Sequence, residues 1–200
     1  MFEVEGFILT GGASSRMGRD KARLLLGGQT FVERIAQALT AIAPGRISLV
    51  SARPEDTQAG LPIVADLHRN CGALGGLHAA LMHTRSAWAA IVSCDLPFVT
   101  GELFMRLTDL RNAGIDAVAP RQSDGRPQPL CAIYAREPCL AVAEEMICTG
   151  ELRPRILLQQ VNTRWAGPAE WGALKRSHLF FCNINEPKDY AKARMKAETK

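Results

Sequence analysis

The sequence predicts an α/β fold in which a largely parallel β-sheet lies between helices on both of its faces. The first observation is an alternation along the chain: short apolar runs, such as residues 7–9 and 47–50, are separated by longer stretches with helical spacing, such as 31–42. The second is that these short runs are continuously apolar, as strands buried on both faces are. Ligands of such sheets bind at the carboxyl ends of the strands, so the residues that follow the strands are the candidates for function.

The expected elements follow from local signals taken in order. The expected strands are residues 7–9, 47–50, 61–65, 88–93, 117–119, 130–134 and 179–182, with a short extended piece and turn at 24–28. The expected helices are residues 31–42, 77–85, 100–110, 137–148, a helix that begins near Pro154, and 188–196. Thr30 and Glu33 have the spacing of a capping box that begins the first helix. Asp124 and Gly125 predict a hairpin turn, and the prolines at 127 and 129 indicate an edge strand or a lip over a cleft.

The composition is that of one globular domain. Among the 200 residues, 47% are hydrophobic and 22% are charged, which excludes a mainly disordered chain. The net charge of +4 suits a small polyanion but is too weak and too dispersed for duplex nucleic acid, so no nucleic-acid partner is expected. No run approaches the ~20 apolar residues of a membrane span, and the N-terminus lacks a signal-peptide pattern. We therefore expect a cytoplasmic protein without a membrane partner.

The six cysteines and four histidines do not predict a zinc site, because they form no C-x-x-C pair and no H-x-x-x-H pair. Most of the cysteines stand in apolar surroundings, as in I-V-S-C-D and F-F-C-N. They are expected to be small buried hydrophobic residues in a reducing compartment.

Residues 7–23 combine a glycine-rich turn with a cluster of bases. The apolar run ends at Gly11 and Gly12, where the backbone can turn sharply and its N–H groups can approach an anion. The cations that follow are Arg16, Arg19, Lys21 and Arg23. The spacing is neither that of a P-loop nor that of G-x-G-x-x-G. A phosphate-binding loop is favoured over an ordinary turn with a solvated basic face, because glycines and bases coincide within about a dozen residues.

Two aspartates follow predicted strands. Asp66 ends the third strand and precedes a loop with three glycines, which allow a close approach of backbone to a ligand. Asp95 follows the most apolar strand, and a carboxylate there is costly to desolvate unless a cation or hydrogen-bond donors meet it. Asp95 is therefore the best candidate for a metal ligand.

Residues 10–21 read T-G-G-A-S-S-R-M-G-R-D-K, which resembles the signature loop of the nucleotidyltransferases, [LT]-[AT]-G-G-x-[SA]-x-R-M-G-x-D-K. The ending, Asp20 and Lys21, is most similar to the molybdenum cofactor guanylyltransferases, whereas sugar-phosphate and terpenoid relatives usually carry P-K. Three further stretches resemble motifs of that family in its order: C-D-L-P-F from Cys94, P-L-C-A-I-Y from Pro129 and N-I-N-E-P-K-D from Asn183. The resemblance spans residues 8–189.

The resemblance implies a single domain with a three-layer, Rossmann-like sandwich, whose mostly parallel sheet contains one antiparallel strand. It also implies an enzyme that uses Mg²⁺ to transfer GMP from GTP to the molybdopterin cofactor, with release of pyrophosphate. Other cofactor-biosynthesis or acceptor proteins are then expected as further partners.

The matched positions imply the site residues. Lys21 and Arg16 would balance the charge of the leaving pyrophosphate, and Asp95 would hold the magnesium ion, which makes these three the expected catalytic residues. The expected nucleotide-binding residues are Leu9, Thr10, Gly11, Gly12, Lys21, Ser51, Asp66, Gly72 and Asp95. Asn183 and Asn185 match asparagines near the pterin side and the metal region of the cleft.

Two departures from the family pattern leave the base contacts open. Ser51 stands where relatives often have asparagine, and Ala73 replaces the proline of G-P-L-x-G, so that loop is expected to be less preorganised. One alternative is a cytidylyltransferase that acts on the same cofactor or on a sugar or alditol phosphate, although that branch generally has G-D in place of Cys94 and Asp95. A catalytically silent nucleotide-binding scaffold is an alternative of another class, although such a protein would be expected to have lost Lys21 or Asp95.

Overall fold

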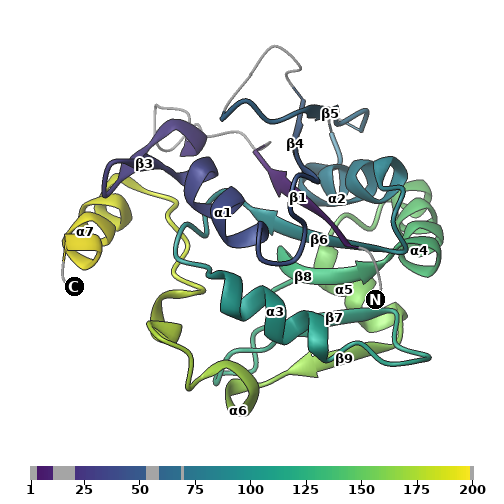
Figure 1. Cartoon of the computed structure of the whole chain (residues 1–200). Helices are drawn as coiled ribbons and strands as arrows, with labels where there is room; N and C mark the ends of the chain where they lie inside the picture. The colour runs from purple at the N-terminus through teal and green to yellow at the C-terminus, as the bar shows by residue number, and fades with distance from the viewer. Residues whose placement is uncertain (1–3, 11–20, 53–58, 69, 199–200) are drawn as a thin grey trace.

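The computed structural model describes residues 4–10, 21–52, 59–68 and 70–198 (Figure 1). The strands of its main sheet are β1 (Val4–Leu9), β4 (Ile47–Ser51), β5 (Ile63–Ala65), β6 (Trp88–Ser93), β7 (Ala117–Pro120), β8 (Cys131–Ala135) and β9 (Thr163–Ala166). They form a seven-stranded sheet in the order β5-β4-β1-β6-β8-β7-β9. Only β8 runs against its neighbours, because β6 and β7 both pair with it antiparallel while the other pairs are parallel. The predicted mostly parallel sheet with one antiparallel strand is confirmed.

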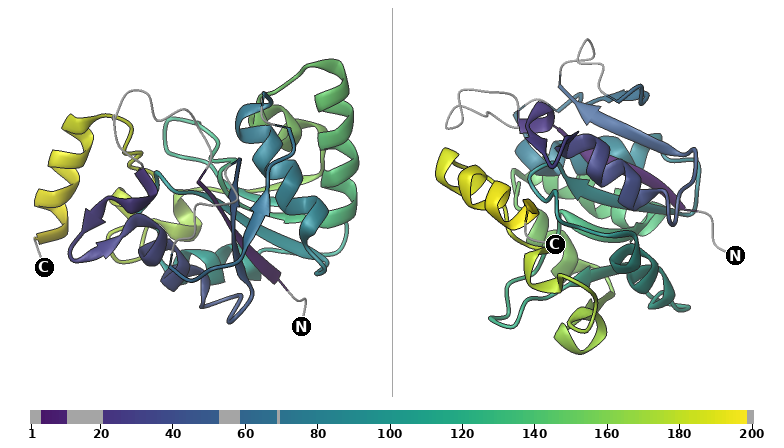
Figure 2. Two further views of the ribbon diagram at one scale, coloured as in Figure 1. Left: turned by 90° about the horizontal axis from the view of Figure 1, so that it is seen from above. Right: turned by 60° about the vertical axis from the view of Figure 1, so that its left-hand side comes forward.

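Helices cover both faces of the sheet. The longer ones are α1 (Phe31–Leu39), α2 (Gly72–His83), α3 (Gly101–Asp109), α4 (Arg136–Thr149), α5 (Pro154–Gln160) and α7 (Pro187–Glu198), and α6 (Pro168–Trp171) is a single turn. One apolar core joins the sheet to α1, α3 and α6, and a second joins its other face to α2, α4 and α5. Figure 2 shows α1 and α3 on one side of the strands and α2 and α4 on the other. The predicted three-layer architecture is confirmed.

Strand β1 lies in the interior of the sheet, between β4 and β6, and both of its faces are apolar. Its side chains alternate between the two cores: Ile8 packs with the α1 side, and Phe7 and Leu9 pack with the α2 side. Leu9 pairs with Val50 of β4 and with Ser93 of β6 in parallel register. The carboxyl ends of these strands therefore meet at one edge of the sheet.

A smaller third core lies beside this edge. It joins the hairpin of β2 (Leu25–Leu26) and β3 (Gln29–Thr30) to α7 and to residues near the short helix η3 (Ser177–Leu179). The capping box is confirmed: Glu33 N donates to Thr30 Oγ1 at 3.1 Å, and Thr30 N donates to Glu33 Oε2 at 2.7 Å. In Figure 2 helix α7 stands next to the β2–β3 hairpin, away from the main sheet.

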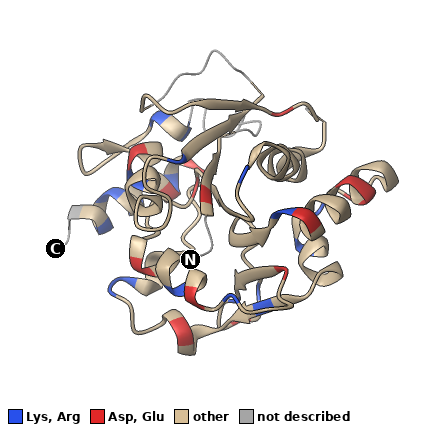
Figure 3. Cartoon of the chain, turned by 45° about the vertical axis from the view of Figure 1, so that its right-hand side comes forward, with Lys and Arg blue, Asp and Glu red and all other residues tan. Residues whose placement is uncertain are grey.

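The charges of the described residues are spread over the surface. Figure 3 shows the acidic and basic positions mainly on helices and loops, and α1, α3, α4 and α7 each carry both signs. Within the described part of the chain, no helix is both long enough and apolar enough to cross a membrane.

The expected strand at residues 179–182 is wrong. Arg176 has a φ of 61°, and the chain continues into η3 instead of extending. Phe180 is fully buried in the α1-side core, and the ring of Phe181 meets Trp171 edge-on with centroids 5.1 Å apart. A short apolar run is compatible with either a strand or a buried turn. Here the packing of Phe180 and Phe181 stabilises the turn.

The strand that completes the sheet is β9, which the sequence did not predict. Its four residues, T-R-W-A, are mostly half-buried and include an arginine, so they lack an apolar run. They pair with β7 at the end of the sheet. An edge strand of this kind needs only one partner, and its sequence signal is correspondingly weak.

The prolines at 127 and 129 led to the prediction of an edge strand, but β8 lies in the interior of the sheet, between β6 and β7. Both prolines precede the strand, so neither removes a hydrogen bond from its ladder. They line a pocket instead. The expectation of a lip over a cleft is therefore confirmed, and that of an edge strand is wrong.

Helix α2 begins at Gly72, five residues before the expected start at Leu77, so its glycines form helical turns and not an open loop. Gly72 has a φ of 55°, which favours glycine, at the first position of the helix. At Gly75 a Cβ atom would lie 2.7 Å from the His68 carbonyl oxygen and 3.0 Å from Asp66 Oδ1. The glycines let the helix approach the strand end that carries Asp66.

This contact predicts that Gly75→Ala destabilises the protein. The added methyl group meets a backbone oxygen, and relieving that overlap costs about 1–3 kcal/mol, which lowers Tm by about 2–4 °C for each kcal/mol in a chain of this size. The matched control is Gly76→Ala, whose Cβ would lie 3.5 Å from Leu9 side-chain carbons, an ordinary contact. Thermal unfolding of both variants tests this: a Gly75→Ala protein that melts no lower than Gly76→Ala contradicts it.

Candidate active site

The predicted functional residues lie at the carboxyl edge of the sheet. Leu9 and Ser51 are the last residues of β1 and β4, Asp66 follows β5, and Asp95 lies two residues after β6. The chain is tied together there by backbone hydrogen bonds, from Asp66 N to Ser51 O and from Cys94 N to Leu9 O, both 3.0 Å. Parallel strands thus bring positions up to 86 residues apart in sequence to one edge.

A small pocket opens between β1 and the start of α2. Leu9, Asp66 and Gly72 line it, together with Val50, Ala73, Gly76, Ser93 and Leu130. Beside it, both the backbone N and the Oγ1 of Thr10 donate to the carbonyl oxygen of Val50 at 3.0 Å. Asp66 Oδ1 accepts a hydrogen bond of 2.9 Å from His68 N, which fixes the orientation of the carboxylate.

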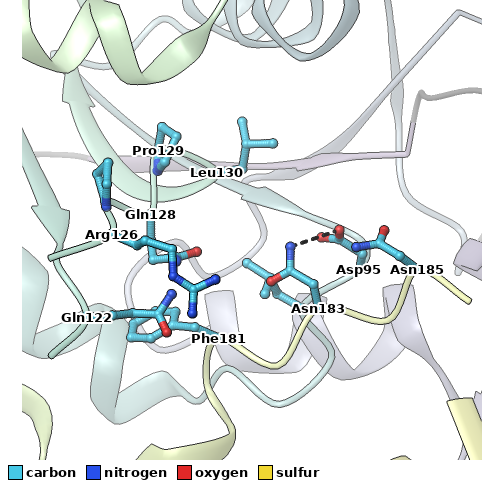
Figure 4. A pocket seen from close by; sticks show the side chains of 11 residues that line it. Asp95, Gln122, Arg126, Gln128, Pro129, Leu130, Phe181, Asn183 and Asn185 are labelled. Atoms are coloured by element: carbon cyan, nitrogen blue, oxygen red, sulfur yellow. Dashed lines mark hydrogen bonds between the residues drawn. The ribbon is translucent and has the colours of Figure 1, made fainter. Parts of the chain in front are cut away.

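A larger pocket of about 500 Å³ lies next to it, and Leu130 lines both. Its lining residues are Asp95, Leu96, Gln122, Arg126, Pro127, Gln128, Pro129, Leu130, Phe181, Asn183 and Asn185 (Figure 4). They come from the end of β6, the hairpin before β8 and the segment that precedes α7. The volume is in the range of small-molecule sites.

Asp95 is held at one end of this pocket. Asn183 Nδ2 donates to Asp95 Oδ2 at 3.3 Å, and Ile184 N donates to the Asp95 carbonyl oxygen at 3.0 Å. The other carboxylate oxygen, Oδ1, is buried and has no hydrogen-bond partner among the described residues. A buried carboxylate oxygen without a partner is costly, so this atom is suited to receive a cation.

Lys21 contacts the same segment of the chain. It opens the short helix η2 (Lys21–Arg23), and its Nζ donates to Asn185 Oδ1 at 2.8 Å. The segment is fixed in turn by Asp189, whose Oδ2 accepts from Asn185 N and from Glu186 N at 3.1 and 3.0 Å. These two backbone hydrogen bonds hold the pKa of Asp189 below its ordinary value. The two asparagines thus connect Lys21 to Asp95 through one short segment of the chain.

The structure brings some of the predicted residues together and separates others. Asp95, Asn183 and Asn185 share the larger pocket, with Lys21 attached through Asn185, whereas Leu9, Asp66 and Gly72 share the smaller one. Ser51 is buried and lines neither pocket. Three predicted residues, Gly11, Gly12 and Arg16, lie outside the described residues.

Sequence reasoning missed the polar residues of the hairpin, Gln122, Arg126 and Gln128, and the aromatic Phe181. The available signal was the proline-rich segment around Asp124 and Gly125, which pointed to a lip over a cleft but not to its inward-facing side chains. Phe181 was assigned to a strand that does not exist.

The larger pocket is suited to bind and orient a charged, polar molecule. Its described lining holds one carboxylate, one guanidinium and four amide side chains, but no hydroxyl, thiol or imidazole group. No cluster of three or more His, Cys, Asp or Glu residues in the described part of the chain could enclose a metal by itself. Such a lining can position reactants and offset charge.

Comparison with known proteins agrees with this geometry. The family model of the MobA-like NTP transferase domain matches residues 6–164. A protein of Pelotomaculum thermopropionicum, named as a probable molybdenum cofactor guanylyltransferase, is 32% identical over 198 residues, which cover 99% of this chain and 95% of that protein. The molybdopterin-guanine dinucleotide biosynthesis protein A of Archaeoglobus fulgidus has a similar structure, with a TM-score of 0.82 and 25% identity over 98% of this chain and all of that one.

A cytidylyltransferase is more distant. The 2-C-methyl-D-erythritol 4-phosphate cytidylyltransferase of Thermus thermophilus is similar with a TM-score of 0.70 at 16% identity, over 98% of this chain and all of that one, which shows a common fold alone. The family model covers most of the chain, and the guanylyltransferase relative covers nearly all of it. This chain therefore belongs to the MobA-like NTP transferase family.

Proposed function

We propose that this protein transfers GMP from GTP to the molybdopterin cofactor, giving molybdopterin guanine dinucleotide and pyrophosphate. The observation that carries the proposal is the short segment of Asn183 and Asn185, which joins Lys21 to Asp95 at the edge of the larger pocket. The relatives named as guanylyltransferases of this cofactor support the choice of substrates.

The proposal assigns one reactant to each pocket. The guanine nucleotide would lie over the strand-end pocket of Leu9, Asp66 and Gly72, and the acceptor would lie in the larger pocket, with Leu130 lining both. An oxygen of the acceptor's terminal phosphate attacks the α-phosphorus of GTP in line; a new P–O bond forms, and the bond to the β-phosphate breaks. The electron pair of that bond leaves with pyrophosphate.

This reaction requires little proton transfer. A phosphate monoester has a second pKa near 6 and is largely ionised at pH 7, so the attacking oxygen needs no general base. That agrees with a described pocket lining without imidazole, hydroxyl or thiol groups. Lys21, together with Arg16, offsets the negative charge that accumulates on the leaving phosphates.

A magnesium ion fits the residues present. Mg²⁺ retains several waters and is usually bound by one or two carboxylates plus phosphate oxygens, so Asp95 with its unpartnered Oδ1 would hold it. When bound, the ion neutralises phosphate charge in the transition state. Asn183 keeps the Asp95 carboxylate in place through its hydrogen bond to Oδ2.

The compartment and the partners are part of the proposal. The six cysteines are free thiols, which suits the reducing cytoplasm. Because the product is a cofactor, proteins that make molybdopterin or accept the dinucleotide are proposed as partners.

Thermal stabilisation by nucleotides distinguishes this function from cytidylyl transfer. With Mg²⁺ present, GTP at about 100 times its Kd stabilises the native state by about 2.7 kcal/mol, which raises Tm by about 5–10 °C for a chain of this size. CTP at the same concentration is expected to have a much smaller effect. A larger shift with CTP favours the cytidylyltransferase, and a shift with GTP but no pyrophosphate release in the presence of molybdopterin favours the silent scaffold.

A further inference from the structure

The larger pocket has two chemically different ends. At one end lie Asp95, Asn183 and Asn185, where the reaction is proposed to occur. At the other lies a set of side chains that we call the distal group: Gln122, Arg126, Gln128 and Phe181. In Figure 4 the guanidinium group of Arg126 and the amide of Gln122 lie beside the Phe181 ring, with Asn183 between this group and Asp95.

Backbone hydrogen bonds hold the hairpin that carries three members of the distal group. Gln122 N donates to Arg126 O, and Gly125 N donates to Gln122 O, each at 2.9 Å. Gln128 N donates to Pro120 O, also at 2.9 Å, which fixes the hairpin to the end of β7. The backbone that carries these side chains is therefore fixed before a ligand arrives, which reduces the entropy cost of binding.

Phe181 is held by packing from behind. Its ring meets Trp171 at 88° and Phe180 at 78°, with centroids 5.1 and 6.2 Å apart. It is half-buried and still lines the pocket. A fixed, partly exposed aromatic face favours stacking with another ring.

Arg126 is available to a ligand at low cost. Its Nε lies 2.6 Å from Asp124 Oδ2, but the two side chains are 72% and 49% exposed. Exposed ion pairs of this kind contribute little to stability, so exchanging Asp124 for a ligand costs little. A guanidinium group also stacks on aromatic planes and donates paired hydrogen bonds, which a lysine cannot do.

The distal group therefore combines planar and hydrogen-bonding surfaces. The two glutamines offer both donors and acceptors, and Arg126 and Phe181 offer flat faces. A sugar or alditol presents hydroxyl groups but no π-face, so it would use only half of these contacts. A fused heteroaromatic ring with amino and carbonyl groups at its edge would use all of them.

We propose that the distal group binds the pterin ring of the acceptor and thereby selects a pterin over a sugar or alditol phosphate. The inference rests on the proposed function, because it assumes that the acceptor's phosphate lies at the Asp95 end. Arg126 and Gln122 are then specificity-determining residues that act on the acceptor and not on GTP.

A pterin without phosphate tests the subsite directly. 6-Hydroxymethylpterin is fluorescent and uncharged. The quenching of its fluorescence on titration with the wild-type protein gives the Kd of the pterin complex. Arg126→Ala and Gln122→Ala are each expected to raise that Kd about tenfold, the scale of one lost hydrogen-bonded or stacked contact. Arg126→Lys should not restore binding, because charge alone is insufficient.

The matched control is Arg106→Ala. Arg106 is an exposed arginine on α3 whose Nε donates to Glu170 O at 3.1 Å, and it lines neither pocket. Its variant should bind the pterin as the wild type does. Absence of saturable quenching by the wild type, or unchanged Kd in both distal variants, overturns the inference, and full rescue by Arg126→Lys shows that Arg126 binds through charge and not through ring recognition.

Steady-state kinetics separates failure of the inference from failure of the proposed function. In the distal variants, KM for molybdopterin should rise about tenfold, while KM for GTP stays as in the wild type. Pyrophosphate release with an unchanged acceptor KM would leave the function intact and overturn the subsite. Pterin binding that depends on Arg126, without any GMP transfer by the wild type, would support the subsite and overturn the proposed function.

Discussion

Asp95→Asn is expected to lower kcat for pyrophosphate release by on the order of 10² or more, the scale of losing one charge-stabilising group. The substitution keeps the volume of the side chain but removes the negative charge at the buried Oδ1, which has no partner among the described residues. The proposed magnesium ion then loses an anionic protein ligand and is bound more weakly. The measurement is steady-state pyrophosphate release with saturating GTP and molybdopterin.

The control for this prediction is Asp109→Asn, an exposed aspartate at the end of α3 that lines neither pocket. Its kcat should equal that of the wild type. A second readout is the Mg²⁺ concentration that gives half-maximal activity, which should rise in Asp95→Asn alone. Near-wild-type turnover of Asp95→Asn at low Mg²⁺ would remove Asp95 from the reaction.

Lys21→Ala is expected to lower kcat by a similar factor of about 10² or more. In the described structure, Lys21 Nζ is held by Asn185 Oδ1 at 2.8 Å, so the ammonium group is positioned beside the larger pocket before substrates bind. Its removal takes away the cation that we propose offsets charge in the transition state. The matched control is Lys192→Ala, an exposed lysine on α7 whose loss should not change turnover.

The position of Lys21 adds a distinguishing readout. Asn185→Ala leaves the lysine in place but frees it from its anchor, so kcat should fall less than in Lys21→Ala. If both variants retain wild-type kcat, the hydrogen bond between Lys21 and Asn185 has no part in the chemistry. If Asn185→Ala is the more impaired of the two, Asn185 and not Lys21 is the essential group.

The parts of the fold that could be predicted are those in which local signals agree with tertiary packing. Strand β6 is an almost continuous apolar run. Thr30 and Glu33 form the capping box that their spacing predicts, and α1 begins there. The parallel arrangement then places Asp66 and Asp95 at one sheet edge without further information. The wrong predictions lie where contacts distant in sequence override the local pattern. Phe181 packs on Trp171 and does not belong to a strand, and Gly75 lies in a helix because its missing Cβ lets α2 approach Asp66.

The candidate site could be predicted only in part for the same reason. A motif resemblance named Asn183 and Asn185, but their contacts join residues 88 and 164 positions apart, and no spacing rule gives such distances. Arg126 and Gln122 stand in a hairpin whose turn was predictable, whereas the direction of their side chains depends on how β8 enters the sheet. Sequence located the edge of the site, and the fold determined which side chains face it.

The most direct measurement follows the phosphorus atoms of GTP in a single reaction. The purified protein is incubated with Mg²⁺, molybdopterin and GTP labelled at either the α- or the γ-phosphate. For the proposed reaction, we expect the α-label in the molybdopterin product and the γ-label in pyrophosphate. A γ-label on the acceptor, a γ-label released as orthophosphate, or transfer of an α-label from CTP but not from GTP would contradict it.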